Sequence, residues 1–221
     1  MKVYFIAGLG ADCRVFRHIR LPEGFEAVHL DWIKPLKGES LHEYGMRLAE
    51  RIDTSEPFAM VGLSMGGMLS IEIAKQHHPI VTILISSVPC SRHLPGYFKV
   101  AGKLKLHRIV PVSLLKKASI IKRFFTAEKD EDKKLLRQLI DETDPAFVSW
   151  ALDAVVKWQC EAFDGHYIQI HGRKDFILPI RFTKPTHVIT SAGHLMVMTK
   201  APEINRIITE TLLTSVAAVH K

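Results

Sequence analysis

The chain has 221 residues and a formal net charge of +7, and with 47% hydrophobic and 24% charged residues it is neither disordered nor collagen-like. A chain of this length buries roughly 70–75% of its unfolded surface, so a hydrophobic core can stabilise it without disulfides or metals. The three cysteines, Cys13, Cys90 and Cys160, match neither a disulfide framework nor a metal knuckle, and no run of about 20 apolar residues could span a membrane. We therefore predict one soluble, cytoplasmic domain over residues 1–221.

Short apolar runs alternate with helical patterns along the chain. The first run, Lys2–Ala7, is followed by glycines and charged residues, which favours a strand over a signal peptide. Further strands are predicted over Phe25–Leu30, Phe58–Val61, Val81–Ser86, Tyr167–Ile170 and Thr186–Thr190, and helices over Leu41–Ile52, Met65–His77 and Pro202–Val219. Regular alternation of this kind is typical of an α/β domain with a mostly parallel sheet.

Residues 91–160 interrupt the alternation. Only helix-like patterns occur there, over Ser113–Phe125, Lys129–Asp141 and Ala146–Val156. Because this segment lies between two predicted strands, we expect an insertion that forms a helical cap over the edge of the sheet.

The positive charge is concentrated in one stretch. Between Glu72 and Glu128 there is no acidic residue, whereas ten lysines and arginines occur there, more than the whole net charge. This stretch is interpreted either as a solvated helical face or as a surface that attracts anionic substrates or lipid headgroups. Because the excess charge is confined to one segment, we do not expect nucleic-acid binding.

The sequence from Phe58 to Leu69, FAMVGLSMGGML, carries the strongest functional signal. It contains Gly62-Leu63-Ser64-Met65-Gly66, a G-x-S-x-G motif between a predicted strand and a predicted helix. Glycines leave room where the helix crosses the strand, and the turn lifts the serine hydroxyl to the positive end of the helix dipole. The alternative is a glycine-rich turn that binds a phosphate or nothing. The context favours Ser64 as a nucleophile.

A serine nucleophile needs a general base, and the base needs an acid that orients it. Among twelve histidines, His194 is the predicted base because it follows the last strand, at the sheet edge where sites form in open α/β sheets. His171 is expected instead to pack or hydrogen-bond at its strand end. Asp175, which follows the strand Tyr167–Ile170, is the predicted acid, although a turn or helix-capping role is the alternative. Its rival Asp164 precedes that strand and would lie at the wrong edge.

Two backbone N–H groups are predicted to bind the oxyanion of an acyl-transfer reaction. One belongs to Met65, directly after the nucleophile, and the other to Leu9, in the turn after the first strand. Gly8 and Gly10 would let that turn approach the substrate. The turn lacks the third glycine of a dinucleotide-binding motif, and the chain has no HExxH motif, so neither a cofactor nor a metal is expected.

These motifs together resemble the α/β-hydrolase superfamily, in its small capped esterase-like branch. The order Ser64, Asp175, His194 is the order of that family. The resemblance rests on Phe5–Asp12, Val61–Gly67, His171–Asp175 and Ala192–His194. It implies about six sheet strands, because the first strand leads straight into the oxyanion turn and the usual leading hairpin is missing. Ala7 stands where many members carry a histidine.

The resemblance implies a serine hydrolase that cleaves a small carboxylic ester or thioester through an acyl-enzyme. A serine at the elbow argues against dehalogenases and epoxide hydrolases, whose elbow carries an aspartate. Three alternatives stay open: a catalytically idle member that binds a ligand or partner, a hydroxynitrile lyase, and an acyltransferase. No stable membrane insertion is expected, and the oligomeric state is left open.

Overall fold

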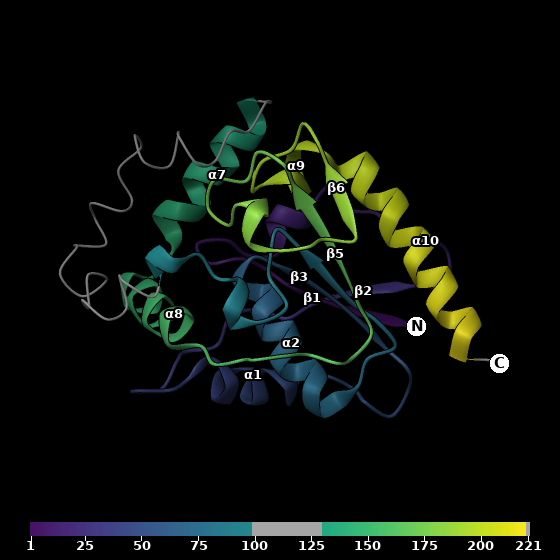
Figure 1. Cartoon of the computed structure of the whole chain (residues 1–221), viewed down its shortest axis with the longest axis horizontal. Helices are drawn as coiled ribbons and strands as arrows, with labels where there is room; N and C mark the ends of the chain where they lie inside the picture. Colours follow the sequence, from purple (N-terminus) through teal and green to yellow (C-terminus); the bar gives the residue numbers. More distant parts are fainter. Residues whose placement is uncertain (99–129, 220–221) are drawn as a thin grey trace.

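A computed structural model describes residues 1–98 and 130–219, and within them a single six-stranded sheet forms the centre of the molecule (Figure 1). Its strand order is β2-β1-β3-β4-β5-β6, and all neighbours pair in parallel. Within the described residues, the prediction of a mostly parallel sheet of about six strands is therefore confirmed. The strands are β1 (Lys2–Ile6), β2 (Glu26–His29), β3 (Ala59–Leu63), β4 (Thr82–Ile85), β5 (Tyr167–Gly172) and β6 (His187–Ile189).

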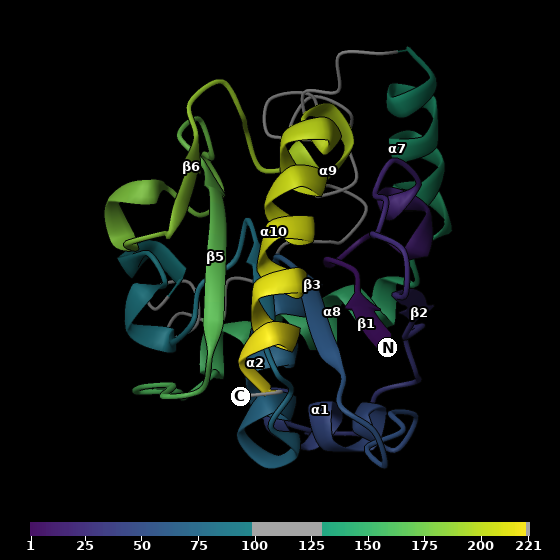
Figure 2. The ribbon, with the colours of Figure 1, turned by 90° about the vertical axis from the view of Figure 1, so that its right-hand side faces the viewer.

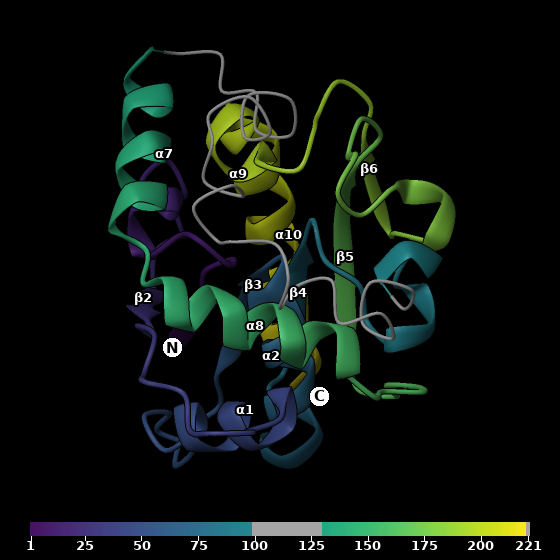
Figure 3. The same ribbon diagram turned by 90° about the vertical axis from the view of Figure 1, so that its left-hand side faces the viewer.

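Helices cover both faces of the sheet. Successive side chains of a strand point to opposite faces, and in β1 this places Val3 and Phe5 in one hydrophobic cluster and Tyr4 and Ile6 in another. The helix α10 (Ala201–Val219) covers the first face, in front of the sheet in Figure 2. The other face carries α1 (Leu41–Ala49) and α2 (Met65–His77), which lie below and behind the green helix that crosses the front of Figure 3.

The segment between β4 and β5 contains two described helices, α7 (Asp130–Glu142) and α8 (Pro145–Lys157). They agree with the patterns predicted over 129–141 and 146–156. The helix predicted over 113–125 and most of the basic stretch, from Lys99 to Arg123, lie outside the described residues. Asp144 begins α8 as its N-cap by accepting the N–H of Ala146, and Pro145 at the first helical position suits that start.

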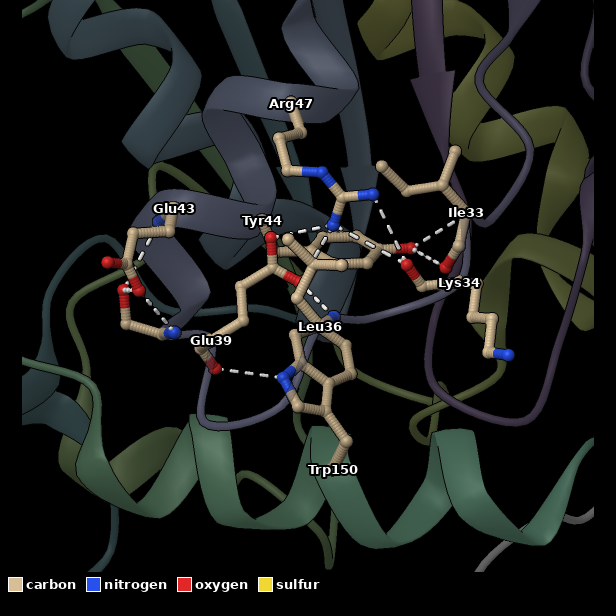
Figure 4. A network of polar contacts seen from close by, with 9 residues as sticks. Ile33, Lys34, Leu36, Glu39, Glu43, Tyr44, Arg47 and Trp150 are labelled. Atoms are coloured by element: carbon tan, nitrogen blue, oxygen red, sulfur yellow. Dashed lines mark hydrogen bonds and ion pairs between the residues drawn. The ribbon is translucent and has the colours of Figure 1, made fainter.

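Polar contacts anchor α8 against the segment that leads into α1 (Figure 4). The indole Nε1 of Trp150 donates to the backbone oxygen of Glu39 at 2.8 Å. The buried Glu39 carboxylate accepts a 2.7 Å hydrogen bond from Arg47 on α1 and another from the N–H of Leu36. The position of α8 is therefore set by α1 and by the loop before it.

Contacts between polar side chains hold α7 in place. On α7, the carboxylate of Asp132 is 1% exposed and pairs with Arg17 and with His18, and Glu142 pairs with Arg14. These partners belong to the segment after β1, so α7 is joined to the part of the chain that follows the predicted oxyanion turn. No described helix is long and apolar enough to cross a membrane.

Candidate active site

Ser64 occupies a sharp turn between β3 and α2. Its backbone has φ +52° and ψ −118°, a conformation rarely adopted by residues other than glycine. The glycines around it are required by contact: a Cβ on Gly62 would lie 2.4 Å from the Cα of Gly67, and one on Gly66 would lie 2.2 Å from the backbone oxygen of Ile6. The G-x-S-x-G motif therefore forms the strand–turn–helix that its sequence predicts.

This packing predicts that Gly66→Ala lowers the free energy of unfolding by about 3 kcal/mol, because the new methyl group meets rigid backbone of β1. Urea denaturation would measure the change. Gly96→Ala is the matched control, since no atom of the described residues lies within 4 Å of a Cβ there, and its midpoint should stay close to that of the wild type. Equal midpoints for the two variants would contradict the packing argument.

The structure brings the predicted nucleophile, base and acid into one hydrogen-bonded chain. His194 Nε2 lies 3.0 Å from Ser64 Oγ, and His194 Nδ1 lies 2.8 Å from Asp175 Oδ2. An imidazole that donates from Nδ1 to the carboxylate keeps Nε2 as the acceptor for the serine hydroxyl. All three residues follow the carboxyl ends of strands, β3 for Ser64, β5 for Asp175 and β6 for His194.

Asp175 is 3% exposed and stays ionised through its neighbours. Burial by itself raises the pKa of this carboxyl, but the charge and hydrogen bond of His194 and the N–H of Leu178 outweigh burial and leave the pKa below its ordinary value. Oδ1 accepts the N–H groups of Ile177 and Leu178, both at 2.9 Å. The rival Asp164 is exposed and precedes β5, at the other end of the strand.

The turn after β1 passes directly against the elbow. A Cβ on Gly8 would lie 3.3 Å from the Cβ of Ser64, so the absence of a side chain there permits the close approach. Leu9 and Met65 both line the cavity that contains Ser64. Within the described residues, neither of their N–H groups donates to a protein acceptor, as expected for Met65 at the first position of α2.

A cavity of about 350 Å³ opens beside Ser64. Its described lining is almost wholly apolar, and the polar members are Ser64, His194 and Thr143. The wall opposite the elbow comes from α7 and α8, which contribute Leu136, Ile140, Val148, Leu152 and Val155. Sequence reasoning missed these wall residues, although the apolar faces of the two helices were the signal that could have found them.

Comparison with protein-family models finds no match, and comparison with curated proteins finds none either. Solved structures do match over nearly the whole chain. An esterase from Exiguobacterium antarcticum superposes with a TM-score of 0.76 at 17% identity, covering 98% of this chain and 92% of the esterase. A thermophilic esterase from Thermogutta terrifontis superposes with a TM-score of 0.70 at 18% identity, covering 97% of this chain and 90% of that esterase. MenH from S. aureus superposes with a TM-score of 0.69 at 14% identity, covering 97% of this chain and 94% of MenH.

The chain has the α/β-hydrolase fold. Identities of 14–18% establish the fold alone. Within the α/β-hydrolase fold, the elbow, the loop after β5 and the loop after β6 lie where the sequence motifs predicted them. Among the described residues, no cluster of histidine, cysteine, aspartate or glutamate could hold a metal ion.

Proposed function

We propose that the protein is a serine hydrolase that cleaves a carboxylic ester or thioester. The observation that carries this proposal is the continuous chain from Ser64 Oγ through His194 to Asp175, with bonds of 3.0 and 2.8 Å, at the mouth of an apolar cavity. A serine hydroxyl becomes nucleophilic when a neighbouring base removes its proton, and this arrangement supplies the base and the group that orients it.

In the proposed reaction, Ser64 Oγ attacks the carbonyl carbon while its proton passes to His194 Nε2. The N–H groups of Leu9 and Met65 stabilise the oxyanion, and Asp175 stabilises the imidazolium that forms. The intermediate collapses as His194 gives its proton to the departing alcohol or thiol, which leaves Ser64 acylated. A water molecule, deprotonated by His194, then attacks the acyl-enzyme, and the acid departs with Ser64 restored.

The cavity favours an uncharged, apolar acyl group as substrate. No charged side chain lines its described part, so a carboxylate or ammonium on the acyl group would lose hydration without gaining a partner. We propose that α7 and α8 belong to a helical cap over residues 91–160 that closes the acyl pocket. Each methylene buried there should contribute about 0.8 kcal/mol, or about fourfold in kcat/KM, until the cavity is full.

Leu152, on the α8 wall, provides a test of pocket length. We predict that Leu152→Phe lowers the hexanoyl-to-acetyl ratio of kcat/KM for p-nitrophenyl esters by about tenfold, because the ring occupies space needed by the longer chain. Leu213→Phe on α10, where the leucine is 51% exposed, is the control and should keep the wild-type ratio. An unchanged ratio in Leu152→Phe would show that the acyl group binds elsewhere.

Covalent labelling tests the proposed function itself. A fluorophosphonate probe should label the wild-type protein and fail to label Ser64→Ala, and a panel of p-nitrophenyl and acyl-CoA esters should then give turnover. A wild-type protein that binds esters without labelling or turnover would instead be an idle member of the fold. Efficient transfer of the acyl group to an added alcohol would favour acyl transfer over hydrolysis.

A further inference from the structure

Three fully buried polar residues lie beneath the candidate site and take no part in the proposed chemistry. Ser87 follows β4, and Gln169 and His171 belong to β5; they are 0%, 1% and 0% exposed. Strands in the middle of a parallel sheet are normally apolar on both faces, because every buried polar group must be compensated. None of the three lines the substrate cavity. Neither the cavity nor the proposed reaction therefore explains why these three polar residues are buried here.

Hydrogen bonds determine the protonation state of His171. Its Nε2 donates to the backbone oxygen of Leu178 at 2.6 Å, and its Nδ1 lies 3.4 Å from the side-chain nitrogen of Gln169. The hydroxyl of Thr183 donates to the other end of that amide at 2.9 Å, which orients the Gln169 nitrogen toward His171. Burial lowers the pKa of His171, so the ring stays neutral with its proton on Nε2.

On the acid side, His171 holds the loop that carries Asp175. The peptide group of Leu178 is bound from both ends: its oxygen accepts from His171, and its N–H donates to Asp175 Oδ1 at 2.9 Å. The ring of His171 also lies close to the carboxylate itself, with Nε2 3.5 Å from Oδ2. The orientation of the acid thus depends on the contact between His171 and Leu178.

On the nucleophile side, the same network reaches the elbow. The Gln169 side chain donates to the backbone oxygen of Ser87 at 2.6 Å, and the Ser87 hydroxyl donates to the backbone oxygen of Ser64 at 2.6 Å. Ser86, directly before it, has φ +47°, so β4 ends in a strained turn that places Ser87 under the elbow. Buried hydrogen bonds therefore connect the backbone of the nucleophile with the loop of the acid.

We propose that His171 is a positioning residue that, with Gln169 and Ser87, holds the acid loop in register with the nucleophile elbow. This inference rests on the proposed function, since it assigns Asp175 as the acid and Ser64 as the nucleophile. His171 acts through Leu178 and touches neither the serine hydroxyl nor the cavity. Misplacing one member of a catalytic group by about 1 Å can cost about 100-fold in rate.

His171→Leu tests the inference, because it removes both ring nitrogens while keeping a buried apolar side chain. With p-nitrophenyl acetate, and per labelled active site, kcat should fall about 10- to 100-fold while KM stays within about twofold. His171→Gln, whose amide nitrogen can donate to Leu178, should recover most of the lost kcat. His29→Leu, which removes an exposed histidine from the end of β2, should keep the wild-type kcat.

An unchanged kcat in His171→Leu, a loss confined to KM, or equal losses in the leucine and glutamine variants would overturn the proposal. Should His171→Leu fail to fold, Thr183→Val removes only the hydroxyl that orients Gln169, and its kcat should fall about three- to tenfold.

Nitrogen NMR of the wild type needs no turnover: His171 should show a proton on Nε2 that persists from about pH 5.5 to 8. A proton on Nδ1 would overturn the proposal even if Ser64 is labelled. An unlabelled Ser64 would overturn the hydrolase assignment instead.

Discussion

Ser64→Ala is expected to lower kcat for ester hydrolysis by about 10³- to 10⁶-fold. The substitution removes the only atom that can form the acyl-enzyme, while His194, Asp175 and the two backbone donors stay in place. The residual rate would come from the oxyanion donors and from substrate binding, with water as the attacking group. Steady-state kinetics with p-nitrophenyl esters, calibrated by fluorophosphonate labelling, would measure the loss.

The free energy of unfolding should hardly change in Ser64→Ala, because the positive φ of +52° at position 64 is about as unfavourable for alanine as for serine. Ser215→Ala is the matched control: Ser215 is a buried serine on α10 whose hydroxyl has no hydrogen-bond partner among the described residues. It should retain wild-type kcat. Turnover near the wild-type level in Ser64→Ala would exclude the proposed mechanism.

Asp175→Asn is expected to lower kcat by about 10²- to 10⁴-fold with the fold intact. The amide oxygen can still accept the N–H groups of Ile177 and Leu178. The amide nitrogen then faces His194 and donates to Nδ1, which moves the imidazole proton to Nε2 and removes the acceptor that Ser64 needs. The imidazolium also loses its counter-charge. Kinetics together with the melting temperature would separate this effect from unfolding.

Asp164→Asn provides the control for the acid. Asp164 is exposed and precedes β5, whereas Asp175 follows the same strand. Replacing Asp164 removes one negative charge from the chain, as Asp175→Asn does, but leaves the candidate site unchanged. The kcat of Asp164→Asn should therefore stay at the wild-type value. A larger loss in Asp164→Asn than in Asp175→Asn would show that the acid has been assigned wrongly.

Local patterns were sufficient to predict the sheet and to place Ser64, Asp175 and His194 near one another at one edge of it. Strand and helix periodicities located all six strands to within a few residues, and the helix Met65–His77 agrees with its prediction at both ends. Parallel strands bring their carboxyl ends to one edge, so Ser64, Asp175 and His194 could be placed together from their positions after three strands. The largest boundary differences are two or three residues: β3 continues to Leu63, β5 continues to Gly172, and α1 already ends at Ala49.

Other features depend on residues that are distant in the chain. The wall of the cavity requires α7 and α8 to lie over the elbow, and their placement follows from contacts such as Trp150 with Glu39 and Asp132 with Arg17. Such contacts join residues more than 100 positions apart and have no local signature. Periodicity indicates the apolar faces of α7 and α8, but only the packing of the folded chain decides that these faces line the cavity beside Ser64.

What the sequence alone determined is the α/β architecture and the place of Ser64, Asp175 and His194 after the ends of three strands, because strand ends, turns and glycine requirements are local properties of the backbone. Only the tertiary structure decided that His171, which the sequence could place no further than a packed or hydrogen-bonded strand end, joins Gln169 and Ser87 in one buried network. Water cannot reach a buried polar group, so the protein itself must supply its hydrogen-bond partner. In this network the partners come from different strands and loops, which are distant from one another in the sequence.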